Sequence, residues 1–183
     1  MKMETLISAF ILVALLSSSY QYQPSTARSV FANDLIDQVC QKTRNPSLCE
    51  STLESDPRSA GSDTKGLAHI VCDKSLDNAN ETLYKVVPEL VGKAREKAVV
   101  DKLQSCRLIY AVIVTDVSSA VAQLDSGKND VALSYLEIAA NGTDSCEKVF
   151  TLVPPKMKSP LSDRDNPLMS LIHIAQDIIH LLV

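Results

Sequence analysis

The sequence has no tryptophan, only five glycines among 183 residues, and few aromatic side chains of any kind. So few glycines leave little of the turn chemistry that a sandwich or barrel of many short strands requires. Leucine, isoleucine, valine and alanine dominate the hydrophobic residues instead, which suits a compact aliphatic core. At this length we expect one domain with a sizeable hydrophobic core.

Strong charge of either sign is also missing. The formal net charge is -4, and the charged residues are interspersed along the chain. No basic block or aromatic-interleaved basic stretch occurs, so a nucleic-acid partner is not expected. The chain lacks a Gly-x-Ser-x-Gly motif, a phosphate-binding loop and a His-Glu-x-x-His motif. We therefore expect neither enzymatic activity nor a cofactor.

Long apolar runs are absent except near the N-terminus, where Lys2 precedes a run over residues 6–16 and three serines follow it. Eleven residues are short for a membrane span but match the core of a secretory signal peptide. We expect residues 1–27 to be this signal, cleaved after Ser19 or Ala27. A buried N-terminal helix is the alternative. The mature chain is expected to be secreted and to have no membrane partner.

Two N-glycosylation sequons agree with export, Asn80-Glu81-Thr82 and Asn141-Gly142-Thr143. Asn80 and Asn141 are therefore the expected glycan acceptors. A third asparagine, in Asn45-Pro46-Ser47, is excluded by its proline.

Apolar residues after the signal repeat at spacings of three and four, which predicts helices. In residues 28–57 two short helices flank a turn, the second beginning after the cap Asn45 and ending at Asp56-Pro57. Residues 63–183 contain four longer amphipathic segments with short connections. The expected fold is all-α, an antiparallel up-down four-helix bundle preceded by an N-terminal helical hairpin.

Proline and glycine predict where these long segments are interrupted. Pro88 should kink the first one near its end, and Gly92 should close it. Gly127 should end the second. Asn141-Gly142 should break or bend the third, which restarts at Thr143.

Export favours disulfides over free thiols or zinc thiolates, so bridges are expected among the five cysteines. Cys40 and Cys49 bracket the turn Thr43-Arg44-Asn45-Pro46, and we expect them to pair. Cys106 lies twenty-one positions before Gly127 and Cys146 nineteen after it. At the rise of an α-helix these heights differ by only ~3 Å.

The rival pairing joins Cys72 to Cys106 across Gly92, where the heights differ by ~9 Å, too far for an undistorted disulfide. We therefore pair Cys106 with Cys146. Cys72 is left as a free thiol, and its place beside Ala68 and Leu76 on an apolar face indicates a buried packing residue. A redox role is the alternative.

Three residues deserve consideration as metal ligands. His173, Asp177 and His180 are spaced four and three apart, so they share one helix face. That face lies opposite the apolar stripe, where polar residues are expected in any case. A secreted metal-binding bundle is thus a distant alternative function, and no metal site is predicted. His69, on the first long helix, has no recognisable carboxylate partner.

The order and spacing of several segments resemble the plant invertase/pectin methylesterase inhibitor family over the whole mature chain, residues 28–183. The segments are Val39-Cys40, Asn45-Pro46-Ser47-Leu48-Cys49, Leu53 to Ala60, Gly66-Leu67-Ala68, Leu103-x-x-Cys106-x-x-x-Tyr110, Asp144-Ser145-Cys146-Glu147-x-x-Phe150 and Ser159-Pro160-Leu161-Ser162. The resemblance implies the same hairpin and bundle, with a second disulfide at Cys106 and Cys146. It also implies a non-enzymatic protein that binds reversibly to a carbohydrate-active enzyme of the cell wall or vacuole and obstructs its substrate cleft.

The family divides by target. Invertase inhibitors often carry Pro-Lys-Phe where the third bundle helix begins, and this chain has Asn129, Asp130 and Val131 at the matching positions. These three are the candidate target-contact residues. We expect an inhibitor of pectin methylesterase in the apoplast, with an inhibitor of cell-wall or vacuolar acid invertase as the alternative.

Overall fold

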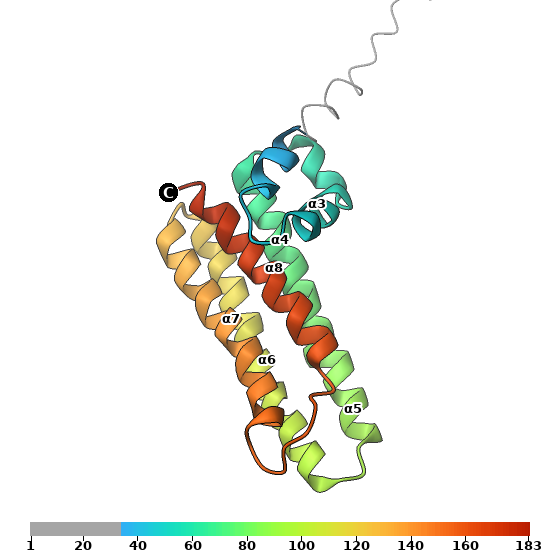
Figure 1. Cartoon of the computed structure of the whole chain (residues 1–183). Helices are drawn as coiled ribbons and strands as arrows, with labels where there is room; N and C mark the ends of the chain where they lie inside the picture. Colours follow the sequence, from blue (N-terminus) through green and yellow to red (C-terminus); the bar gives the residue numbers. More distant parts are fainter. Residues whose placement is uncertain (1–33) are drawn as a thin grey trace, which may run out of the picture.

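The computed structural model describes residues 34–183 of the chain (Figure 1). The predicted signal peptide 1–27, with both of its candidate cleavage points, lies outside the described residues. The first residues of the predicted hairpin, 28–33, lie outside them as well. A helical segment over residues 34–40 is the first part of the hairpin that the structure describes.

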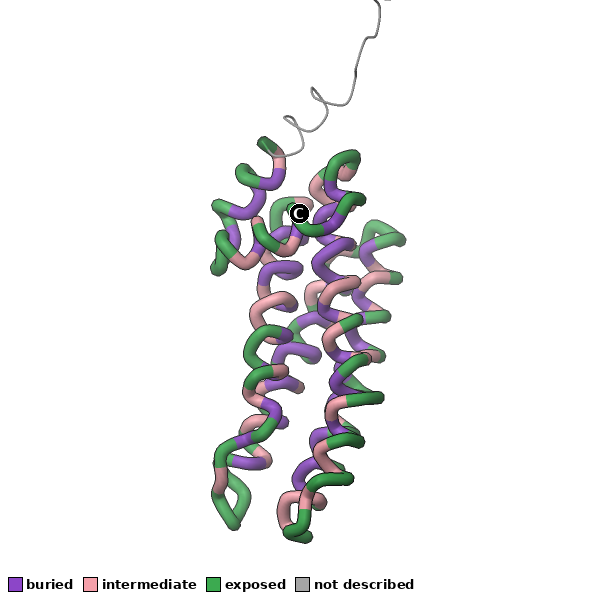
Figure 2. The backbone as a smooth tube through the Cα atoms, turned by 90° about the vertical axis from the view of Figure 1, so that its right-hand side faces the viewer, coloured by how far each residue is buried: buried purple, intermediate pink, exposed green. Residues whose placement is uncertain are grey.

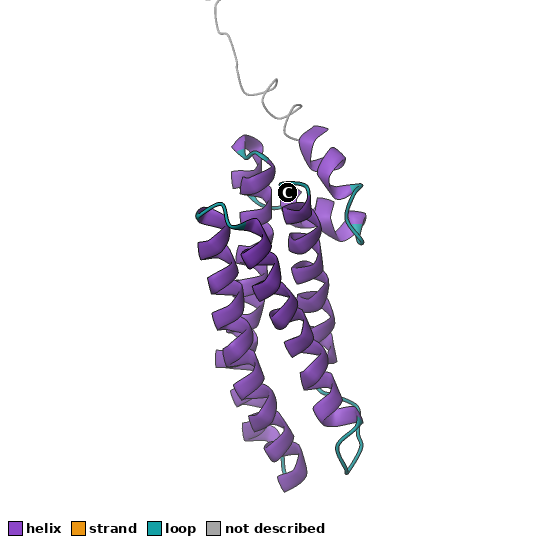
Figure 3. Cartoon of the chain, turned by 90° about the vertical axis from the view of Figure 1, so that its left-hand side faces the viewer, coloured by secondary structure: helices purple, strands orange, loops and turns teal. Residues whose placement is uncertain are grey.

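Helices follow one another without a strand throughout residues 34–183 (Figure 3). After the segment 34–40 they are α3 (Pro46–Glu54), the 3₁₀ turn η1 (Pro57–Gly61), α4 (Thr64–Glu81), the π-turn η2 (Thr82–Val86), α5 (Val87–Lys93), α6 (Lys97–Asp125), α7 (Asn129–Thr151) and α8 (Ser162–His180). The expected all-α class is confirmed.

Four long elements form the bundle: α4 with its continuation α5, then α6, α7 and α8 (Figure 1). Successive elements run in opposite directions, and the hairpin of 34–40 and α3 lies at one end of the bundle. Buried residues line the inward faces of the long helices, and exposed residues line the outer faces (Figure 2). The predicted up-down bundle with a preceding hairpin is therefore the observed fold.

Pro88 does not end the first long element, because a π-turn lies immediately before it. The N–H of Val87 donates to the carbonyl of Thr82, five residues earlier, and helix continues through α5 to Lys93. Proline has no N–H to donate, and its ring crowds the carbonyl four residues back. A wider turn at this point relieves that conflict. Where the sequence predicted a kink at Pro88, the structure has a π-turn directly before it.

The predicted break at Asn141-Gly142 is wrong, since α7 runs unbroken from Asn129 to Thr151. Packing against the neighbouring helix explains why position 142 is a glycine. A Cβ atom built on it would lie only 2.7 Å from Cγ1 of Ile113, on the neighbouring helix α6. Glycine is needed here because α6 and α7 approach too closely for any side chain.

Candidate functional site

Two disulfides stiffen the scaffold that carries the candidate site. Cys40 is bonded to Cys49 with a Cα–Cα distance of 5.4 Å, and Cys106 to Cys146 with 5.0 Å. These are the two pairings that the sequence predicts. The first closes the hairpin, and the second joins α6 to α7.

Cys72 is a free cysteine that lies buried on α4. Burial raises the pKa of its thiol to about 12. A thiol is nucleophilic as the thiolate, so this cysteine is inert at neutral pH. The geometry agrees with a packing role rather than a redox role.

Arg44 ties the hairpin to the last helix through Asp177. Its backbone N–H donates to Asp177 Oδ2 at 2.8 Å, and its guanidinium forms an ion pair with the same carboxylate at 2.9 Å. Gln176, the neighbour of Asp177, accepts a further bond from Arg44 and donates to Glu137 of α7. A chain of polar contacts thus links the hairpin, α8 and α7.

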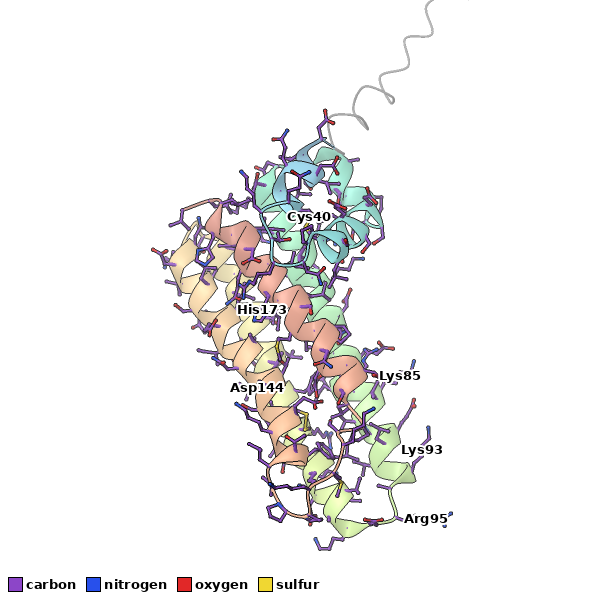
Figure 4. All side chains as sticks on the ribbon, viewed as in Figure 1. Cys40, Lys85, Lys93, Arg95, Asp144 and His173 are labelled. Carbon is purple, nitrogen blue, oxygen red and sulfur yellow. A yellow bond between two sulfur atoms is a disulfide. The ribbon has the colours of Figure 1, made fainter. Side chains whose placement is uncertain are left out.

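The same contacts argue against the metal alternative at His173, Asp177 and His180. The Asp177 carboxylate is already paired with Arg44, and the positive charge of Arg44 beside His173 would repel a metal cation. No group of three or more potential ligands is placed to hold a metal within residues 34–183. Figure 4 shows His173 on α8 below the hairpin of Cys40, while Lys93 and Arg95 lie at the far end of the bundle.

His69 has a carboxylate partner that sequence reasoning missed. Its Nε2 lies 3.1 Å from Oδ1 of Asp125, and Lys65 donates to the backbone carbonyl of Asp125 at 3.1 Å. These contacts join the first turns of α4 to the end of α6. The partners lie 56 or more positions apart, so no local pattern points to them.

The corner between the hairpin and the bundle is built around Asp56. It accepts the N–H of Arg58 at 3.0 Å and also bonds the guanidinium of Arg58, while Lys74 lies 3.2 Å away. Arg58 reaches across to Asp73 on α4 at 2.6 Å. These cations hold the pKa of Asp56 well below its usual range.

The three candidate target-contact residues begin α7, at the end of the bundle where the chain also ends. Asp130 and Val131 are exposed. Asn129 is half-buried, and its amide donates to the carbonyl of Leu182 at 3.3 Å. Asp130 and Val131 are thus free to meet a partner, whereas Asn129 fastens α7 to the C-terminal residues.

Sequence reasoning missed an exposed apolar surface on the stapled helix pair. Leu108 and Val112 project from α6 with 72% and 54% exposure, and Ile138 projects from α7 with 52%. Leu108 and Val112 are four residues apart and therefore neighbours on one face. Because Gly142 lies against Ile113, the antiparallel register brings Ile138, one turn earlier in α7, level with the turn of α6 that follows Val112. We name these three residues the α6/α7 face.

Helix α6 is unusual for the apolar character of its outer side. By length and hydropathy it would qualify as a membrane span, a test that the core helix of a soluble bundle also passes. Only 33% of its most apolar stretch is buried in the bundle. Much apolar side chain is therefore left facing outward, including Leu108 and Val112. Such a patch is typical of an interaction site.

Asp116 is a polar residue next to these apolar side chains on α6. It lies one turn beyond Val112 on α6 and is only 9% exposed. Its Oδ2 is buried without a hydrogen-bond partner, and burial raises its pKa. A buried acceptor without a donor costs free energy.

No constellation of nucleophile, base and oxyanion donors is brought together within the described part of the chain. A stapled helical bundle with an exposed apolar face is typical of a protein that binds another protein. The comparison with family models identifies it further, since residues 34–178 match the plant invertase/pectin methylesterase inhibitor family. The chain belongs to this family, which consists of proteinaceous enzyme inhibitors.

Individual relatives agree with this assignment. The chain is 34% identical to a pectinesterase inhibitor from Actinidia deliciosa over 97% of this chain and 94% of that protein. It is 29% identical to cell wall / vacuolar inhibitor of fructosidase 2 from Arabidopsis thaliana, over 78% and 80%. The crystal structure of a mutant form of an Arabidopsis pectin methylesterase inhibitor shares the fold, with a TM-score of 0.68, 23% identity and coverage of 81% and 97%.

Proposed function

We propose that the mature chain inhibits pectin methylesterase by reversible binding through the α6/α7 face, which places the bundle across the substrate cleft of the enzyme. The observation that carries this proposal is the exposure of Leu108, Val112 and Ile138 on a helix pair that a disulfide holds rigid. A prefolded surface loses little conformational entropy on docking, so more of the contact energy appears as affinity.

Two observations favour pectin methylesterase over acid invertase as the target. The pectinesterase inhibitor from Actinidia deliciosa matches nearly the whole chain at 34% identity, whereas the fructosidase inhibitor matches 78% of it at 29%. The start of α7 also carries Asn129-Asp130-Val131 in place of the Pro-Lys-Phe frequent in invertase inhibitors. Acid invertase remains the second candidate because relatives of both names match.

The experiment adds the purified mature protein to a plant pectin methylesterase and, separately, to a cell-wall invertase, and measures both activities. We expect inhibition of the methylesterase at nanomolar to micromolar inhibitor and none of the invertase. Inhibition of the invertase alone would reverse the choice of target. Inhibition of neither enzyme would contradict the proposal.

Variants of the α6/α7 face test the surface itself. Val112→Asp and Leu108→Asp place a charge in the proposed contact and should weaken inhibition at least tenfold. The matched control is Tyr84→Asp, which alters an equally exposed apolar side chain on η2, outside the face. Circular dichroism confirms that each variant is folded. Equal inhibition by Val112→Asp and Tyr84→Asp would show that docking uses another surface.

The sequon at Asn141 bears on the same surface. Asn141 is exposed and lies three residues after Ile138, on the same side of α7. A glycan there would stand beside the α6/α7 face, so we expect Asn141→Gln protein from a plant host to inhibit at least as well as the unaltered protein. Asn80 lies half-buried on α4, away from this face, and Asn80→Gln is the control.

We propose secretion to the cell wall as the location in which this inhibition occurs, with the vacuole as the alternative. The support is the predicted signal in residues 1–27 and a relative named as a cell wall / vacuolar inhibitor. Expression of the full chain in plant cells, followed by N-terminal sequencing of apoplastic fluid, tests this. A mature chain that begins directly after Ser19 or Ala27 is expected, and an intact Met1 would contradict secretion through this signal.

A further inference from the structure

Four polar side chains from three different helices converge where α8 begins. Asp165 of α8 is completely buried, and Tyr110 of α6 donates its hydroxyl to Asp165 Oδ1 at 2.6 Å. Glu147 of α7 is the neighbouring carboxylate that, with burial, raises the pKa of Asp165. Ser162, in the first turn of α8, donates to Glu147 Oε2 at 3.1 Å.

Each of the two carboxyl groups has one satisfied oxygen and one unsatisfied oxygen. Asp165 Oδ2 and Glu147 Oε1 are both buried, and neither has a donor in the described structure. Two ionised carboxylates offer only acceptors, so they cannot satisfy each other, and their charges repel. A single proton between them turns one oxygen into a donor and satisfies both.

We propose that Asp165 and Glu147 share one buried proton, and that this proton latch holds the start of α8 against α6 and α7 in acidic surroundings and loosens as the pH rises. The proposal concerns the folded chain alone and does not depend on which enzyme is inhibited.

The charged groups around the pair supply no positive charge, so the proton is what lowers the negative charge of the pair. Arg164, the neighbour of Asp165, turns toward the first long element, where it binds Glu81 at 2.5 Å and Thr82 Oγ1 at 3.1 Å. Thr82 also faces Tyr110. No lysine or arginine within residues 34–183 forms an ion pair with either member of the latch.

The direction of the pH effect follows from this burial. Burial and the nearby Glu147 raise the pKa of Asp165 to about 8, although the Tyr110 hydroxyl opposes the shift. An aspartate in the unfolded chain titrates near 4. The folded state therefore retains a proton that the unfolded chain releases, and stability falls between about pH 4 and pH 8. A difference of one bound proton corresponds to about a tenfold fall in the folding constant per pH unit.

The test compares urea unfolding of the mature protein with that of Asp165→Asn at intervals from pH 4 to pH 9. The asparagine amide can donate to Glu147 while its carbonyl still accepts from Tyr110, so it replaces the shared proton permanently. We expect the ratio of the folding constant of Asp165→Asn to that of the unaltered protein to rise at least tenfold between pH 5 and pH 8. The matched control Asp163→Asn removes an exposed carboxylate from the same turn and should show no such gain.

Parallel pH profiles for the unaltered protein and Asp165→Asn would overturn the proposal. If Asp165→Asn does not fold, Glu147→Gln supplies the amide from the other side and must show the same gain. The ¹³C chemical shift of the Asp165 carboxyl gives a direct reading, since a latch requires a protonated group at pH 6. Calcium ions are also tested for stabilising the protein. If they stabilise the unaltered protein and do not stabilise Asp165→Asn, the pair holds a cation, and the proposal of a shared proton is overturned.

Discussion

Gly142 of α7 lies so close to Ile113 of α6 that no side chain fits between them. A Cβ at position 142 would come 2.7 Å from Ile113 Cγ1 and 3.1 Å from its Cδ1. The contact lies about one turn from Cys146 along α7 and about two turns from Cys106 along α6, so the disulfide and the close contact join neighbouring stretches of the two helices. This contact sets the register that brings Ile138 level with the outward-facing apolar side chains of α6.

Gly142→Ala should therefore destabilise the protein. Overpacking costs about 1–3 kcal/mol, and the gain in helix propensity offsets up to about 1 kcal/mol of it. Gly92→Ala is the matched control, because nothing lies within 4 Å of a Cβ there, and it should be neutral or slightly stabilising. Urea unfolding measures both. Combining Gly142→Ala with Ile113→Ala should cost less than the sum of the two, and strict additivity would contradict the contact.

The disulfides and the free thiol should differ sharply in chemical behaviour. Cys72 is buried with a raised pKa, so the native protein should show no thiol that reacts rapidly with Ellman's reagent at pH 8, and the urea-unfolded protein should show one. Two or more rapidly reacting thiols in the native protein would contradict the assigned bridges. Cys72→Ala provides the control, because it should remove the single signal.

Removal of the Cys106–Cys146 bridge should be costly. In the chain-entropy model, a closed loop of 40 residues contributes about 4 kcal/mol, whereas the loop of 9 residues between Cys40 and Cys49 contributes about 3 kcal/mol. We expect Cys106→Ala/Cys146→Ala to lower the free energy of unfolding by several kcal/mol. Cys40→Ala/Cys49→Ala should lower it less and loosen mainly the hairpin. Hydrogen exchange of the two variants distinguishes these outcomes, and equal loss of protection across the bundle would count against them.

The Arg44–Asp177 contact should hold the hairpin on α8 with modest energy. Arg44 is half-exposed, so solvent screening limits the ion pair to about 1 kcal/mol. Asp177→Ala should cost more than Arg44→Ala, because it also leaves the backbone N–H of Arg44 without its acceptor. A double-mutant cycle on the free energy of unfolding isolates the pair, and a coupling of zero would show that the side chains do not interact.

Asp56 should make the corner beside the hairpin sensitive to acid. Its pKa is lowered in the folded state by Arg58 and Lys74, so its contribution is present at neutral pH and is lost as the pH falls below the unfolded value near 4. Asp56→Asn should cost about 1–3 kcal/mol at pH 6, in line with hydrogen bonds to charged groups. The cost should shrink toward pH 2, and a cost that is constant with pH would contradict the ion pairs. Asp63→Asn, which changes an exposed helix cap, is the control.

Local patterns predicted much of this fold because helices are built from near neighbours. The three-four spacing of apolar residues marked each long element, and the nearly equal distances of Cys106 and Cys146 from Gly127 predicted their disulfide. The interruption predicted at Gly142 was wrong because that prediction considered a single helix. A glycine within a helical pattern suggests a break when only its own helix is considered, whereas the neighbouring helix made it necessary.

The contacts that place the hairpin and close the bundle could not be found in this way. Arg44 and Asp177 are 133 positions apart, and His69 and Asp125 are 56 apart. Asp177 looked like a possible metal ligand with its helix neighbours and proved to be the partner of an arginine. The α6/α7 face was also missed, because helical periodicity marks the residues that face the core and does not show which outward residues of two helices come together.

By itself the sequence determined the helical class, the pairing of four cysteines, and the family to which the chain belongs, because periodicity, turn residues and ordered motifs are local properties. Only the tertiary structure decided which apolar side chains face outward, which carboxylates meet cations, and which buried carboxylate oxygens are left without a donor. Those outcomes depend on distances between segments far apart in the chain. The surface proposed to meet the target enzyme is among them.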